Sequence, residues 1–369
     1  MSHKVSTCEV LVAGGGIIGA ACARAAAMVG LRVIVCEPGP EPAAASLASA
    51  GILGAQIEGA DESLRALGLR GRDLYEHLAA ELQETTGIDI GLWREGIASL
   101  AFTEAEAERL RDGVAHQRQA GLRCDWLESG DVAERFPGAA PCLGALYAPE
   151  DGAVNAPRLA KALLADAQRR GVQVLAAGVQ RLNSILGRAT GAETSAGKIK
   201  AEHVIVAAGA WSPRIEHLPR TLPVEPVRGQ MAALPWPSGV PRAILYYEHG
   251  YVVARDGEAL MGSTMEHVGF DNSVTDAGLE EILANAVRLC PALASRGPMR
   301  SWAGLRPVTP DGRPIVGADP DVRGLWYATG HGRNGVLLAA LTGEIIASLV
   351  TTGTSEIEIA SLAPERFTS

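Results

Sequence analysis

A short apolar run that ends in a glycine-rich turn constrains the fold of this chain more than any other feature. Residues 8–13 are rich in β-branched side chains and predict a strand, and residues 20–29 predict a helix. Between them lie Gly14, Gly16 and Gly19. At this spacing the first glycine permits a tight turn, the second lets the backbone approach a pyrophosphate, and the third lets the helix pack against the strand.

A second strand and an acidic residue complete the pattern. Residues 32–36 form an apolar run, and Glu37 follows about twenty residues after the glycines. An acid at this place accepts hydrogen bonds from an adenosine ribose and disfavours a 2′-phosphate. The pyrophosphate would lie at the N-terminus of the intervening helix. The residues predicted to contact the dinucleotide are Gly14, Gly16, Ile17, Ile18, Gly19 and Glu37.

Two later segments favour FAD over NAD as the dinucleotide. Residues 203–211 run from an apolar strand into a turn, and residues 325–335 do the same before an apolar helix over 336–350. A nucleotide domain assembled from distant segments is therefore expected. The positive end of the last helix's dipole would lie near the flavin. An NAD-linked dehydrogenase with the same glycine pattern is the alternative that these segments leave open.

Composition limits the class of the protein. The 369 residues are 47% hydrophobic and 20% charged, which allows one large domain or two, and no run of about 18 apolar residues offers a membrane span. A net charge of −9 argues against nucleic acid as a partner. The six cysteines are scattered without metal-ligand spacing, so no metal site is expected. Arg24 and Arg32 interrupt the apolar N-terminal stretch, which disfavours a signal peptide and predicts a cytoplasmic location.

Taken together, these segments resemble the D-amino-acid oxidase and sarcosine oxidase superfamily, and most closely the glycine oxidases of thiamine biosynthesis. The resemblance covers nearly the whole chain. Besides the glycines and Glu37, it rests on four segments: 48–56 (ASAGILGAQ), 228–230 (RGQ), 302–311 (WAGLRPVTPD) and 330–335 (GHGRNG).

The resemblance implies a mixed α/β fold with two domains. A Rossmann-like FAD-binding domain would comprise residues 1–85, 151–222 and 310–369. A substrate domain, built on a mixed or antiparallel sheet, would comprise residues 86–150 and 223–309. Within the second domain, apolar patterns predict strands over 243–247, 250–255 and 258–265, and an amphipathic helix over 276–289.

The resemblance also implies further FAD contacts. They fall after the second strand and in the two later glycine turns, and His331 is expected to contact the flavin through its backbone. No cysteine stands near residues 303–306, where related sarcosine oxidases attach their flavin, so noncovalent FAD is expected. The implied contacts are Ser49, Ala50, Gly51, Leu53, Val179, Gly209, Trp211, Gly330, His331, Gly332, Arg333, Asn334, Gly335 and Val336.

The implied reaction is the oxidation of a carbon–nitrogen bond in a small amino acid. Arg306 matches the family's carboxylate-binding arginine, because a planar guanidinium grips a carboxylate with two parallel hydrogen bonds. Tyr251 matches a family tyrosine that lies beside the substrate, and Met265 matches a methionine in the pocket wall. Arg333 matches an arginine near the flavin and the pocket entrance. The His249-Gly250-Tyr251 segment departs from the glycine oxidase pattern by the glycine between His and Tyr. No catalytic base is needed, since the flavin performs the chemistry.

Glycine is the expected substrate, with sarcosine and small D-amino acids next, and O2 would be reduced to hydrogen peroxide. A D-amino-acid dehydrogenase that passes electrons to a quinone or another acceptor is the main alternative. A flavin-bearing protein without turnover is a further one. The resemblance also suggests a homotetramer.

Overall fold

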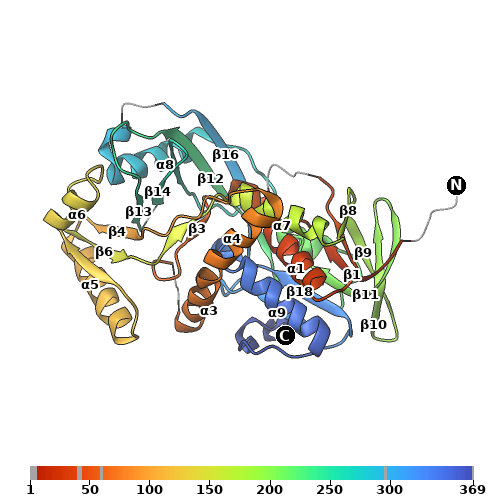
Figure 1. Ribbon diagram of the computed structural model, residues 1–369. Helices are drawn as coiled ribbons and strands as arrows, with labels where there is room; N and C mark the ends of the chain where they lie inside the picture. Colours follow the sequence, from red (N-terminus) through yellow and green to blue (C-terminus); the bar gives the residue numbers. More distant parts are fainter. Residues whose placement is uncertain (1–5, 40–43, 59–60, 249, 295–296, 368–369) are drawn as a thin grey trace.

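Two large β-sheets organise the chain, as the computed structural model shows (Figure 1). The structure describes residues 6–39, 44–58, 61–248, 250–294 and 297–367. Within these residues each large sheet has eight strands, and a small two-stranded sheet lies apart from both. The two large sheets occupy opposite ends of the molecule in Figure 1.

The first sheet has the strand order β17-β18-β11-β1-β2-β8, and β10 and β9 extend it from β11. Strand β1 pairs in parallel with both β2 and β11. Its apolar side chains are buried, as expected for a parallel strand covered on both faces. The strands are β1 (Ser6–Ala13), β2 (Val33–Cys36), β8 (Gln173–Leu175), β9 (Val179–Ile185), β10 (Arg188–Thr194), β11 (Gly197–Val206), β17 (Ile315–Ala318) and β18 (Leu325–Thr329).

Helices pack on this first sheet and on one another. Helix α1 follows β1 directly and packs closely because Gly19 has no side chain, since a Cβ there would lie 1.9 Å from the carbonyl oxygen of Gly14. Apolar side chains of α1, α7 and α9 join the buried cores beside the sheet. The helices of this part are α1 (Ile17–Met28), α2 (Ala45–Ala48), α3 (Glu62–Asp73), α4 (Tyr75–Thr86), α7 (Ala156–Arg169) and α9 (Ala339–Thr352).

The second sheet has the order β16-β12-β15-β14-β13-β4-β6-β5 and is almost entirely antiparallel, with one parallel pair between β13 and β4. Helix α8 packs its apolar residues on this sheet. The strands are β4 (Ile97–Ala101), β5 (Asp125–Glu128), β6 (Gly144–Ala148), β12 (Glu225–Pro235), β13 (Ile244–Tyr247), β14 (Gly250–Arg255), β15 (Glu258–Gly262) and β16 (Arg300–Val308). The helices are α5 (Glu104–Gln119), α6 (Ser129–Arg135) and α8 (Asp276–Leu289).

The segment after β2 connects the two sheets. Its strand β3 (Ile52–Leu53) pairs with β7 (Gly152–Ala153) in the small sheet. From the second sheet, the indole of Trp302 donates to the carbonyl of Ala48 at 3.0 Å, and Arg255 donates to the carbonyl of Ala50 at 2.9 Å. Five short 3₁₀ helices complete the described part: η1 (Gly209–Arg214), η2 (Pro291–Leu293), η3 (Gly332–Asn334), η4 (Ala360–Leu362) and η5 (Pro364–Phe367).

The predicted mixed α/β fold is confirmed, and several element boundaries differ from expectation. The strand predicted over 258–265 ends at Gly262, and the helix predicted over 20–29 spans Ile17–Met28. The helix predicted over 336–350 spans Ala339–Thr352, because residues 335–338 form a turn after η3. Helix α8 has the predicted bounds. Each large sheet draws its strands from one of the two predicted sets of segments, which supports the domain division; that division stays a prediction.

Neither a membrane-spanning helix nor a metal cluster occurs within the described residues. No helix there has the length and apolar character needed to cross a bilayer. No three His, Cys, Asp or Glu side chains of that part gather as metal ligands would. All six cysteines are free thiols, and all except Cys142 are buried.

Candidate active site

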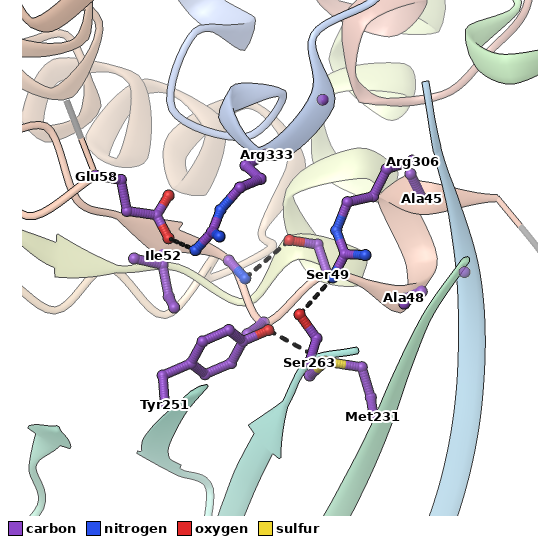
Figure 2. Close-up of a pocket in the computed structure, with 15 residues that line it drawn as sticks. Ala45, Ala48, Ser49, Ile52, Glu58, Met231, Tyr251, Ser263, Arg306 and Arg333 are labelled. Carbon is purple, nitrogen blue, oxygen red and sulfur yellow. Dashed lines mark hydrogen bonds and ion pairs between the residues drawn. The ribbon is translucent and has the colours of Figure 1, made fainter. Parts of the chain in front are cut away.

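A cavity of about 80 Å³ lies where the segment after β2 meets the second sheet. Strands β12, β14 and β16 contribute one side, and the turn after β18 contributes another. Figure 2 shows the charged side chains that point into it. The lining residues are Ala45, Ala48, Ser49, Ala50, Gly51, Ile52, Glu58, Gly229, Met231, Tyr251, Ser263, Gly304, Arg306, Gly332 and Arg333.

Arg306 brings a positive charge into this cavity from strand β16. Its guanidinium donates to the carbonyl of Thr264 at 3.1 Å. It also donates to the hydroxyl of Ser263 (Figure 2). Both partners are neutral, and no carboxylate of the described residues forms an ion pair with it. Burial lowers the pKa of Arg306. A half-buried guanidinium without an acidic partner is a receptor for an anionic ligand.

Gly229 makes room for the guanidinium of Arg306. Strands β12 and β16 pair antiparallel, with Val227 opposite Arg306 and Gly229 opposite Gly304. Gly229 is therefore the diagonal neighbour of Arg306 on the same face of the sheet. A Cβ at position 229 would lie 2.0 Å from one terminal nitrogen of Arg306 and 2.3 Å from the other. The absence of a side chain at 229 lets the guanidinium lie across the strand.

Tyr251 lies beside Arg306 and is buried on strand β14. Its hydroxyl donates to the sulfur of Met231 at 3.1 Å (Figure 2). The ring stacks on that of Tyr246, with centroids 5.8 Å apart. Burial raises the pKa of Tyr251, so the phenol keeps its proton at neutral pH and remains a hydrogen-bond donor.

Arg333 enters the cavity from η3 and carries an acidic partner. Its guanidinium forms an ion pair with Glu58 at 3.0 Å (Figure 2). The hydroxyl of Tyr246 contacts both the carboxylate of Glu58 and the guanidinium of Arg333. The charge of Glu58 raises the pKa of Arg333. The two arginines of the cavity therefore differ, because one is neutralised within the protein and the other is not.

The turns that would hold FAD lie at one edge of the first sheet. The glycine turn after β1, Glu37 after β2, Gly209 after β11 and Gly330 after β18 all follow the carboxyl ends of adjacent parallel strands. Dinucleotides bind at this edge in open parallel sheets. Gly14 adopts a φ of +106°, which suits the tight turn. These residues fit FAD, which would lie across the turns toward the cavity.

Side chains at this edge of the sheet hydrogen-bond to the backbone and to one another. A carboxylate oxygen of Glu37 accepts a hydrogen bond from the N–H of Gly15 at 2.6 Å, and the hydroxyl of Ser46 accepts one from the N–H of Ile17 at 2.9 Å. His331 is buried, with Nε2 at 3.0 Å from the hydroxyl of Thr342. Its Nδ1 has no partner among the described residues, and burial lowers the pKa of His331 to about 3. The buried imidazole is therefore neutral at neutral pH, and its expected backbone contact with the flavin stays a prediction.

The structure gathers part of the predicted site into the cavity. Of the predicted substrate residues, Arg306, Tyr251 and Arg333 line it, together with Ser49, Ala50, Gly51 and Gly332 from the predicted FAD contacts. Leu53 is buried in β3, Val179 begins β9, and Trp211 lies in η1 against Phe270. Ile18 lies in α1 and Asn334 is the last residue of η3, while Gly335 and Val336 lie between η3 and α9. Their roles as FAD contacts stay predictions.

Met265 is not where the sequence placed it. Its side chain is 50% exposed and does not line the cavity. Strand β15 ends at Gly262, so the alternation that would direct residue 265 inward does not extend that far. Met231 of strand β12 lines the cavity instead. His249, the first residue of the motif that contains Tyr251, lies outside the described residues.

Several lining residues were missed by sequence reasoning. Glu58 follows the 48–56 segment and Gly229 lies within the 228–230 segment, but the sequence alone predicts no role for either. Met231 belongs to strand β12, whose apolar pattern indicates packing only, and Ser263 directly follows the end of β15. The pairing register of β12 with β16 identifies Gly229, because it places this glycine diagonally across from Arg306.

Comparisons with known proteins agree with this geometry. A glycine oxidase of Geobacillus kaustophilus is 37% identical over 99% of this chain and 98% of its own. The crystal structure of that glycine oxidase matches with a TM-score of 0.94 at 36% identity, covering 99% of this chain and 100% of the other. An iminodiacetate oxidase from Chelativorans sp. BNC1 matches with a TM-score of 0.89 at 29% identity, covering 96% and 99%.

A longer relative and a family profile complete the comparison. A bifunctional protein ThiO/ThiG of Trichormus variabilis is 35% identical over 98% of this chain, which spans 55% of that protein. The profile of the DAO family, described as FAD dependent oxidoreductase, matches residues 9–349. With the glycine turns at one sheet edge and the cavity beside them, this match shows that the chain belongs to the DAO family of FAD-dependent oxidoreductases.

Proposed function

We propose that this protein oxidises the carbon–nitrogen bond of a small amino acid, with glycine preferred and sarcosine next. The observation that carries the proposal is Arg306, a guanidinium with only neutral partners, facing a small cavity beside the buried hydroxyl of Tyr251. The similarity to glycine oxidases over nearly the full length supports it. Membership of an FAD-dependent family removes the NAD-linked dehydrogenase from the alternatives.

The residues of the chain bind and align the substrate. Arg306 holds the carboxylate with two parallel hydrogen bonds, and the protonated Tyr251 donates a third. Arg306 and Tyr251 lie on strands of one sheet. Binding of the carboxylate to them therefore fixes the position of the α-carbon that carries the amine. FAD, when bound, accepts the hydrogen and electron pair removed from that carbon, so the chain needs no acid–base pair for this step. The imine product gives glyoxylate and ammonia with water, and O2 yields hydrogen peroxide.

The substrate preference is tested with a peroxide assay over glycine, sarcosine, D-alanine, D-proline and the corresponding L-amino acids. We expect glycine and sarcosine both to react, because one methyl group changes transition-state binding by only about 10 to 200-fold. L-Amino acids should not react. If the carboxylate is held by Arg306 and the α-hydrogen points toward the flavin, the amine and the side chain of an L-amino acid occupy each other's positions relative to a D-amino acid. Faster turnover of a bulky D- or any L-amino acid than of glycine would contradict the proposal. Turnover with a dye acceptor but without peroxide would favour the dehydrogenase.

We expect the FAD to be noncovalent, because no cysteine stands in the strand segment Ala303 to Arg306 beside the cavity. Acid precipitation should leave the yellow colour in the supernatant. Absorbance of the supernatant and of the dissolved pellet measures the distribution. Colour retained in the washed pellet would show a covalent bond. The homotetramer implied by the resemblance and the cytoplasmic location predicted from the N-terminal sequence also stay predictions.

A further inference from the structure

We propose that Glu58 sets the substrate range by neutralising Arg333, so that the cavity selects amino acids with a single carboxylate. Without the charge of Glu58, Arg333 would become a second carboxylate site and the protein would accept amines with two carboxylates. This inference rests on the proposed function, because it concerns which amino acids reach Arg306.

The two arginines lie in one cavity but have different partners. Arg306 donates to Ser263 and Thr264, which are neutral, whereas Arg333 forms an ion pair with Glu58 at 3.0 Å. Figure 2 shows both guanidinium groups directed into the same space from different elements. Among the described residues lining the cavity, Arg306 is then the one cation without an acidic partner.

Glu58 is held in place by the protein interior. Its side chain is only 11% exposed. The two preceding residues, Gln56 and Ile57, donate their backbone N–H groups to a carboxylate oxygen of Asp151 at 2.9 and 3.1 Å. Asp151 is fully buried and pairs with the buried Arg72 at 3.0 Å. A loop fixed in this way keeps the acid in place beside Arg333, whose own side chain is 49% exposed.

Tyr246 strengthens the pair between Glu58 and Arg333. Its hydroxyl contacts both, and its ring stacks on the ring of Tyr251. Burial and the charge of Glu58 raise the pKa of Tyr246, so the phenol remains a donor to the carboxylate. The three side chains form a neutral group next to the substrate position. A glycine carboxylate then balances the charge of Arg306, whereas a second substrate carboxylate would enter the cavity uncompensated, which is costly.

Sarcosine and iminodiacetate are the matched probes. They differ by one carboxylate on the N-methyl carbon, so their ratio of kcat/KM isolates the effect of the second charge. In Glu58→Gln, which keeps a hydrogen-bonding partner for Tyr246, we expect the iminodiacetate-to-sarcosine ratio to rise about 10 to 100-fold. This range corresponds to one added hydrogen bond between charged groups. Glu58→Ala should raise the same ratio and provides a second variant if glutamine disturbs folding.

The double variant Glu58→Gln with Arg333→Gln identifies the receptor. In the double variant the iminodiacetate-to-sarcosine ratio should return toward that of the wild type, because Arg333 is the cation that Glu58→Gln leaves without an acidic partner. Glu76→Gln, on the exposed side of helix α4, is the matched control and should leave the ratio unchanged. A ratio that stays constant in both Glu58 variants, or a gain that persists in the double variant, would overturn the proposal.

A binding measurement separates this inference from the proposed reaction. Diglycolate and methoxyacetate carry two and one carboxylates but an ether in place of the amine, so they bind without being oxidised. Their dissociation constants can be read from changes in the absorbance of bound FAD. We expect Glu58→Gln to tighten diglycolate about tenfold or more relative to methoxyacetate. If the wild type oxidises neither glycine nor sarcosine, the proposed function fails, and equal changes for both ethers would still refute the role of Glu58.

Discussion

Replacement of Arg306 by alanine is expected to lower kcat/KM for glycine about a hundredfold or more, because the carboxylate loses a bidentate charged partner in a half-buried cavity. Arg306→Lys should recover only part of this loss, since an ammonium restores the charge without the planar pair of donors. Steady-state peroxide formation over a range of glycine concentrations gives both kcat and KM. FAD content should stay unchanged, because Arg306 lies on β16 of the second sheet.

Arg300→Ala is the matched control for this substitution. Arg300 lies on the same strand β16, is 51% exposed, and pairs with Glu258 at the surface. We expect kcat/KM to stay close to that of the wild type, since exposed pairs contribute about 1 kcal/mol or less. If Arg306→Ala also retains near-normal kcat/KM, another group must hold the carboxylate.

Gly229→Ala is expected to reduce kcat/KM by about a hundredfold although it adds only a methyl group. The new Cβ would lie 2.0 Å from a terminal nitrogen of Arg306. Backbone on both strands is fixed by the ladder between β12 and β16, so the flexible end of the arginine must move. A guanidinium displaced by about 1 Å no longer places the substrate correctly. Affinity for methoxyacetate, measured from the FAD spectrum, should fall in parallel.

A double-variant comparison shows whether Gly229 acts through Arg306. Adding Gly229→Ala to Arg306→Ala should cause little further loss, because residues that share one interaction have non-additive effects. Gly130→Ala is the control, since a Cβ at that position in helix α6 would meet no atom within 4 Å. Full additivity of the two substitutions would indicate that Gly229 supports the fold rather than the position of Arg306.

The parts of the fold that the sequence predicted are those with local patterns. The run before Gly14 is a buried parallel strand and the helix over 276–289 is amphipathic, so both are readable from neighbouring residues alone. The strand predicted to reach Met265 stopped three residues earlier, because the alternation of side chains does not reveal where a strand leaves its sheet. Helix α9 starts later than predicted for a similar reason: residues 335–338 form a turn, and an apolar run does not distinguish a tight turn from a helix.

The candidate site was only partly predictable. Arg306 and Tyr251 were found through motifs that resemble a known family, whereas periodicity alone would have made them ordinary strand residues. Glu58 could not be paired with Arg333 from the sequence, because 275 residues separate them and no local pattern records the contact. Met231 reaches the cavity only through the pairing of β12 with β15 and β16. Contacts of this kind depend on the register of distant strands.

The order of strands in the first sheet has a consequence for how the protein is made. The glycine turn after β1 is synthesised before β11, β18 and the turn at Gly330. Because β11 lies between β1 and β18, the sheet edge proposed to hold FAD is incomplete until the C-terminal strands have been added. On this arrangement we expect a chain that ends before β18 not to retain the cofactor. The yellow colour of bound FAD would therefore report that the first sheet is fully assembled.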